Sequence, residues 1–298
     1  MTLVDVINLF DTDEKCRELL VRLRWPNGVE CPRCKMPAVD LATAKQLFYC
    51  KGCDYQFSVT SGTVFNDSHL PLQKWFLATL LLCEAKKGMS ANQIKRTLGV
   101  SYKTAWYLCH RIRFAMTEVH KMLDGTIEID ETYVGGKQKG KGVGFGKRQK
   151  EVVIGIVKRD GELKFIHVKE GTSKAIREVM QEHVSEDVDV IVTDESVLYA
   201  SGLPKTQVSK RKAVNHSADE YVRYENGFMV TTNTVESAFS LFKRGVMGSW
   251  HRVSPKHLAS YLNEMTFRFN RRKSHALFLD TLRHMVTAPV LTFQTLTA

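Results

Sequence analysis

The sequence predicts a multidomain chain with α+β and α/β character: a four-cysteine module, a helical segment, and a mixed sheet flanked by helices. Three observations predict this order. Two paired-cysteine motifs lie near the N-terminus, apolar residues recur at helical spacing between residues 72 and 116, and strand-like runs begin at Thr126. The chain has 298 residues, enough for several compact parts. We place the domains at 1–66, 67–122 and 123–298.

The first domain, residues 1–66, begins with a helical lead-in over 3–24, and paired cysteines follow. Fifteen residues separate the two CxxC motifs, and each motif is a tight turn that directs two sulfurs at one centre. Strands in the spacer can bring the two turns together. We therefore predict a structural Zn²⁺ in a zinc ribbon; the alternative is two unrelated redox pairs. The predicted ligands are Cys31, Cys34, Cys50 and Cys53.

The second domain, residues 67–122, has the layout of a helix-turn-helix. A helix behind Pro71 reaches Gly88, a short helix starts at the N-cap Ser90, and a longer helix over 101–116 follows the turn at Gly99. An ordinary helical hairpin is the alternative, although no carboxylate occurs between Lys86 and Arg113. Outside the expected buried stripe of the longer helix lie the candidate DNA contacts Lys103, Thr104, Tyr107, His110 and Arg111.

The third domain, residues 123–298, changes to a strand pattern. We expect strands at 126–134, 152–158, 163–168 and 188–193, with a helix at about 173–183 between the last two. Helices return near 234–243, 255–270 and 276–286. The Gly/Lys-rich segment 137–150 lacks a packing pattern, and we expect a mobile loop there.

Three carboxylates of this domain form a candidate metal site. Asp130 lies inside the first strand, Asp194 ends the last strand, and Glu236 begins a helix. Carboxylates at the ends of neighbouring strands can present oxygen ligands to Mg²⁺ or Mn²⁺. Two such cations, about 3.5–4 Å apart, would support in-line displacement at phosphorus. Each residue also has a structural alternative: Asp130 could end a strand, Asp194 could cap a helix, and Glu236 could satisfy Asn233 in a capping pattern.

The charge of the chain favours a polyanionic partner. The formal net charge is +11, and three basic clusters lack acidic residues: 86–113, 137–150, and Lys205 with 210–212. No apolar run approaches the ~18 residues of a membrane span, and the N-terminus does not resemble a signal peptide. We therefore expect a cytoplasmic, nucleoid-associated protein without a membrane partner. In a reducing cytoplasm, the three of its seven cysteines that lie outside the CxxC motifs should be buried thiols.

Long motifs resemble one protein family. The stretches IEIDETYVGGK, VTDESVLY and TTNTVESAFSLFKRG, together with the CPRC and CKGC motifs, resemble the ISXO-like group of bacterial insertion-sequence transposases. The resemblance covers roughly residues 15–285. It implies an RNase H-like DDE core with two Mg²⁺ or Mn²⁺ ions, in which Asp130 and Asp194 are the first two catalytic carboxylates. Glu236 is the expected third, but the group has either Glu or Asn there, so Asn233 remains an alternative.

The resemblance implies a transposase that binds the inverted repeats of its element and cleaves and joins double-stranded DNA. Bringing two ends together requires a homodimer or a larger synaptic assembly. A retired transposase acting as a DNA-binding regulator and a metal-dependent nuclease without strand transfer are the alternatives. We expect His216 and Glu131 to support the carboxylates. Further candidate DNA contacts are Lys210, Arg211, Lys212, Lys243 and Arg244.

Overall fold

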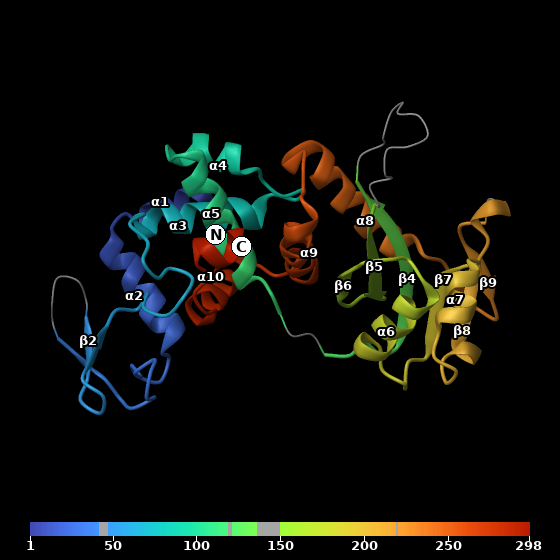
Figure 1. Ribbon diagram of the computed structural model, residues 1–298, viewed down its shortest axis with the longest axis horizontal. Coiled ribbons are helices and arrows are strands. Elements are labelled where there is room, and N and C mark those ends of the chain that lie inside the picture. The colour runs from blue at the N-terminus through green and yellow to red at the C-terminus, as the bar shows by residue number, and fades with distance from the viewer. Residues whose placement is uncertain (42–46, 119–120, 136–149, 219) are drawn as a thin grey trace. The chain divides into compact units, whose positions relative to one another are not determined.

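The computed structural model describes residues 1–41, 47–118, 121–135, 150–218 and 220–298. The expected mobile loop at 137–150 lies outside these residues, apart from Lys150. The chain forms two compact units: residues 1–117 with 271–298, and residues 118–270 (Figure 1).

The first unit is built mainly of helices. They are α1 (Leu3–Leu9), α2 (Asp13–Arg24), α3 (Leu72–Glu84), α4 (Ala91–Leu98), α5 (Tyr102–Ala115), α10 (Leu277–Thr287) and α11 (Phe293–Thr297). The expected helix-turn-helix helices are confirmed as α4 and α5, and the turn residue Gly99 adopts a left-handed conformation with φ 61°. Helix α3 ends at Glu84, earlier than the expected Gly88.

Helix α10, together with the rest of residues 271–298, belongs to the first unit, which corrects our boundary at 123–298. Helix α10 packs against α2, α3 and α5. The Phe76 ring contacts Phe10 and Phe278, with centroid distances of 5.1 and 6.0 Å, and Cys83 Sγ lies 3.2 Å from Thr281 Oγ1. The sequence shows that α10 is amphipathic but not which core its apolar face enters.

The ribbon is a three-stranded antiparallel sheet of β1 (Val39–Asp40), β2 (Phe48–Cys50) and β3 (Tyr55–Phe57). Its apolar core is small. The rings of Phe48 and Phe57 pack around Trp25 at the end of α2, with centroids 5.5 and 5.9 Å from the Trp25 ring. A core of this size gives little stability alone, which is the usual reason for a metal in such a module.

The second unit contains a five-stranded mixed sheet in the order β6-β5-β4-β7-β8. The strands are β4 (Thr126–Val134), β5 (Glu151–Lys158), β6 (Leu163–Val168), β7 (Val190–Asp194) and β8 (Arg211–Val214). Strand β4 is central and pairs antiparallel with β5 and parallel with β7. This arrangement is consistent with the expected RNase H-like core. Strand β8 is too short and polar for its sequence to predict it.

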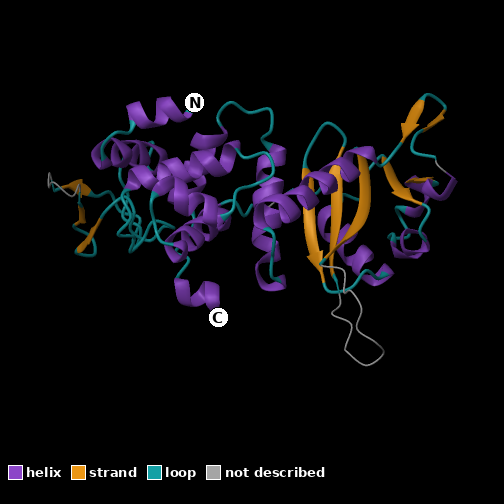
Figure 2. Cartoon of the chain, turned by 90° about the horizontal axis from the view of Figure 1, so that it is seen from above, coloured by secondary structure: helices purple, strands orange, loops and turns teal. Residues whose placement is uncertain are grey.

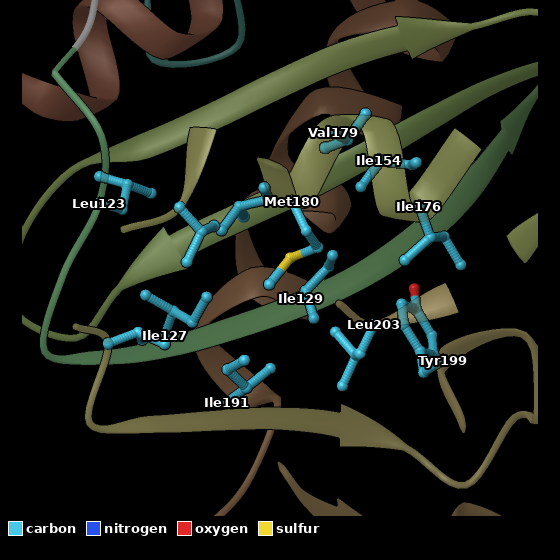
Figure 3. Close-up of a cluster of buried hydrophobic side chains, with 13 residues drawn as sticks. Leu123, Ile127, Ile129, Ile154, Ile176, Val179, Met180, Ile191, Tyr199 and Leu203 are labelled. Atoms are coloured by element: carbon cyan, nitrogen blue, oxygen red, sulfur yellow. The ribbon is translucent and has the colours of Figure 1, made fainter. Parts of the chain in front are cut away.

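Helices cover both faces of this sheet (Figure 2). Helices α6 (Ser173–His183) and α7 (Val197–Gly202) cover one face, where Ile127 and Ile129 of β4 enter a buried apolar cluster (Figure 3). Helices α8 (Asn233–Gly245) and α9 (Pro255–Asn270) pack on the other face. Because side chains alternate along a strand, Glu128 and Asp130 point to the face that α8 covers.

Shorter elements complete the second unit. A hairpin of β9 (Arg223–Glu225) and β10 (Phe228–Val230) precedes α8, and a π-helical turn, Val246–Trp250, continues it. Short 3-10 turns span Val208–Lys210 and His216–Ala218. Within the described residues, no helix has both the length and the apolar character that crossing a membrane requires.

Candidate functional site

The four expected zinc ligands come together at one point in the ribbon. The Sγ atoms of Cys31 and Cys53 are 3.6 Å apart, those of Cys34 and Cys50 are 3.4 Å apart, and all four sulfurs lie within 4.8 Å of one another. A tetrahedral Zn²⁺ with Zn–S bonds of about 2.3 Å requires sulfur separations of about 3.8 Å. The cluster therefore fits a structural Zn²⁺ ion, as the spacing predicted.

Two of the predicted catalytic carboxylates lie on adjacent strands. The parallel register of β4 and β7 pairs Glu128 with Val192. Asp130 follows two residues later on β4, and Asp194 is the last residue of β7. An Asp130 carboxylate oxygen accepts a hydrogen bond of 2.8 Å from the Glu131 amide, and Asp194 accepts one of 3.0 Å from the Ser196 amide. Asp194 therefore makes the local bond of a turn-forming residue, and its negative charge is close enough to Asp130 to raise the pKa of that carboxyl.

Helix α8 brings the third carboxylate to the same place. Glu236 lies in its first turn and lines a cavity of about 380 Å³ together with Asp130 and Glu131. The exposed cations Lys243 and Arg244, expected to neutralise phosphate, line the same cavity. The site thus combines carboxylates for divalent cations with basic side chains for an anionic substrate.

The carboxylates influence one another strongly. Burial, together with the negative charges of Glu131, Asp194 and Glu236, raises the pKa of Asp130 to about 7, although the hydrogen bond from the Glu131 amide opposes this shift. Burial also raises the pKa of Glu131, although a hydrogen bond from the Tyr199 hydroxyl opposes that shift. Several partly buried carboxylates close together favour a bound cation, which removes the repulsion between them.

Glu236 lines the cavity and has two polar partners there. Glu236 Oε1 accepts a 2.8 Å hydrogen bond from Thr232 Oγ1 and lies 3.1 Å from His216 Nε2. The expected support from His216 is thus directed at the Glu236 carboxylate. Asn233 is exposed and is the first residue of α8. Its backbone amide donates a hydrogen bond to Thr231 Oγ1 and not to Glu236. The capping alternative for Glu236 is therefore wrong.

The sequence did not point to several residues that shape this site. The hydroxyls of Tyr199 and Thr232 donate to Glu131 and Glu236, and Glu128 binds the start of α8. One signal was present for Glu128: it precedes Asp130 by two residues, so both share one face of the strand. For Thr232 the signal was its spacing, since it precedes Glu236 by four residues at the start of a helix. The contact of Tyr199 with Glu131 joins residues 68 apart and leaves no pattern in a single sequence.

Fewer side chains of α5 are exposed than the sequence predicted. His110 and Arg111 are buried, with 1% and 4% of their surfaces exposed, so our placement of these two side chains among the outward-facing DNA contacts was wrong. Arg111 donates to the Asn66 carbonyl, because the segment before α3 covers this side of the helix. Tyr107 donates a 2.5 Å hydrogen bond to the Leu291 carbonyl. Lys103 remains exposed.

The basic cluster at 210–212 is tied into the protein. Lys210 donates to the Glu186 carbonyl, and Arg211 donates to the Asp194 carbonyl at 2.8 Å. Lys212 forms an ion pair with Glu225 of β9. The cluster is acid-free only along the sequence, because the hairpin supplies the carboxylate of Glu225. The structure therefore gives all three side chains a partner within the protein, and their contact with DNA stays a prediction. Arg211 instead secures the strand end that carries Asp194.

Comparison with known proteins identifies two parts of the chain. Residues 122–270 match the model of the ISXO2-like transposase domain, and residues 11–56 match that of the transposase zinc-ribbon domain. The chain is also 32% identical, over 281 residues, to a protein in the transposable element ISH50 of Halobacterium salinarum, covering 88% of this chain and 92% of that protein. The chain therefore belongs to the insertion-sequence transposases that combine a zinc ribbon with an ISXO2-like transposase domain.

Proposed function

We propose that this transposase cleaves DNA at the ends of its element and joins the freed ends to target DNA, using divalent cations. The observation that carries the proposal is one cavity in which Asp130 and Glu236 face Lys243 and Arg244, with Asp194 at the adjacent strand end. This set of residues matches a reaction at a phosphodiester, which needs both cation ligands and compensation of phosphate charge.

Each residue has a separate part in the proposed reaction. Asp130, Asp194 and Glu236 would hold two Mg²⁺ or Mn²⁺ ions, which activate an attacking water or 3′-hydroxyl and stabilise the leaving oxygen when bound. Lys243 and Arg244, two turns further along α8, would bind the phosphates that flank the scissile bond. Attack in line at phosphorus requires no covalent link between protein and DNA.

DNA recognition is proposed for the first unit. Membership of the transposase family implies DNA binding, and the helix-turn-helix arrangement of α4 and α5 provides an element suited to the major groove. Lys103 and Thr104, near the start of α5, are the proposed contacts of this helix. We further propose that the protein acts as a homodimer or a larger assembly, because both ends of the element must be held during strand transfer.

A plasmid that carries the gene with its native flanking DNA tests these proposals. With Mg²⁺ or Mn²⁺, we expect the purified protein to cut at the element ends and to form joined products. The Asp194→Asn variant should bind the same DNA without cutting it. Tight binding by the wild-type protein without metal-dependent cleavage would instead indicate a regulator, and cleavage without joined products would indicate a nuclease.

A further inference from the structure

Glu128 is a buried carboxylate outside the proposed set of metal ligands. It lies on β4, two residues before Asp130, and its side chain is 0% exposed. One of its oxygens accepts hydrogen bonds from the amides of Thr234 and Val235, at 2.8 and 3.1 Å. The other accepts from the Thr234 hydroxyl and from Arg159 Nε, both at 3.0 Å. A charge removed from water persists only when it is paired and hydrogen-bonded in this way.

These bonds cap the helix that carries Glu236. The first amides of a helix lack partners within the helix and carry partial positive charge. In α8, the N-cap residue Thr232 directs its hydroxyl to Glu236, and the carboxylate of Glu128 takes the place of a side-chain cap. The cap therefore comes from the strand that also carries Asp130, which ties the start of α8 directly to that strand.

Arg159 extends the same link to the chain segment before the helix. Besides its bond to Glu128, its guanidinium donates to the carbonyls of Met229 and Thr231, at 2.6 and 3.0 Å. The backbone is thus held on both sides of Thr232, by Arg159 before it and by Glu128 after it. Glu236 follows Val235 directly, so its position relative to Asp130 depends on these contacts.

We propose that Glu128, paired with Arg159, is a positioning residue that holds Glu236 at the distance from Asp130 needed to share divalent cations. This inference rests on the proposed function, because it takes Asp130 and Glu236 to be ligands. Glu128 itself would touch neither cation nor DNA, since helix amides and Arg159 occupy its oxygens. Because Glu128 fills the N-terminal end of α8, that helix end is also closed to a DNA phosphate.

A purely structural role is the alternative, and a matched variant distinguishes it. Glu264 of α9 is also 0% exposed, and its carboxylate lies 3.1 Å from Arg268. Glu264→Gln therefore removes a buried, arginine-paired charge from the same unit, away from the cap of α8. Glu128→Gln removes the corresponding charge at the cap and keeps the shape of the side chain.

The experiment measures Mn²⁺ binding by titration calorimetry with the zinc-loaded full-length protein, alongside thermal unfolding and plasmid cleavage. We expect Glu128→Gln to weaken Mn²⁺ binding by about 10–100-fold, as loss of an outer partner of a metal site does, and Glu264→Gln to leave it within about twofold of the wild type. High Mn²⁺ should partly restore cleavage by Glu128→Gln but not by Glu236→Ala, which lacks the ligand itself.

Unchanged Mn²⁺ affinity in folded Glu128→Gln would overturn the inference and leave the proposed function intact. Equal weakening in both glutamine variants would also overturn it, because it would reflect general destabilisation. If Glu128→Gln does not fold, Arg159→Lys provides the test, since lysine cannot make all three guanidinium contacts; wild-type affinity in that variant would contradict the inference. A wild-type protein without Mn²⁺-dependent cleavage would refute the proposed function, and this inference with it.

Discussion

Gly155 provides a direct test of how closely α8 packs on the sheet. It lies on β5 directly opposite Asp130, on the face that α8 covers. A Cβ atom there would lie 2.7 Å from the Phe239 ring, 3.0 Å from Val235 and 3.1 Å from Phe165. Ordinary contacts of a Cβ begin at about 3.4 Å, so Gly155→Ala requires Phe239 to move by about 0.7 Å.

The surroundings leave little room for that movement. The Phe239 ring stacks on Phe165, with a centroid distance of 5.1 Å and an interplanar angle of 16°. An added methyl group in such a core destabilises by about 1–3 kcal/mol. For a unit of this size, a loss of about 2 kcal/mol lowers Tm by about 4–8 °C. Because Phe239 and Glu236 share α8, Gly155→Ala should also weaken Mn²⁺ binding.

The matched control is Gly248→Ala, which adds the same methyl group in the helical turn after α8. No described heavy atom would lie within 4 Å of that Cβ, and alanine is the better helix former. We expect a Tm equal to or slightly above that of the wild type. Differential scanning calorimetry of the three proteins makes the comparison. A Gly155→Ala variant as stable as Gly248→Ala would show that α8 is not packed tightly against β5 at this point.

Three further predictions address the metals, the pH dependence and the DNA contacts. Cys50→Ser should abolish bound zinc in metal analysis, whereas Cys16→Ala, outside the cluster, should retain it. Without added Mg²⁺ or Mn²⁺, Asp130 should contribute a loss of stability as pH rises from about 4 to about 7, because the folded protein keeps the Asp130 proton up to about 7 while the unfolded chain releases it near 3.8. In Asp130→Asn, the free energy of unfolding, measured with urea at several pH values, should no longer show this contribution. The same dependence on pH in the variant and in the wild type would contradict a raised pKa of Asp130. Lys243→Ala should weaken DNA binding and lower the slope of log affinity against log salt concentration by about one. Lys212→Ala should have a smaller effect, because Lys212 is paired with Glu225. Equal effects of the two variants would argue against the cavity as the phosphate site.

The parts of the protein whose chemistry is local could be predicted from the sequence alone. Two CxxC turns at the right spacing define a thiolate cluster without reference to any other segment, and the structure places all four sulfurs within 4.8 Å. Helices α4 and α5 were equally readable, because caps at Ser90 and Ser101 and the turn at Gly99 act within a few residues. Asp130, Asp194 and Glu236 were chosen by resemblance, since acidic residues alone carry no mark of being ligands.

The segments against which these local features pack could be identified only from the folded chain. Burial of His110 and Arg111 depends on neighbours that cover α5, and the pairing of Lys212 depends on a hairpin carrying Glu225. Likewise, α10 joins the first unit although it follows the second in the chain. Hydrophobic periodicity fixes which face of a helix is buried, but not what covers it. For the same reason, the sequence shows that Glu128 is a strand residue but not that it contacts α8. That contact joins residues more than a hundred positions apart in the chain.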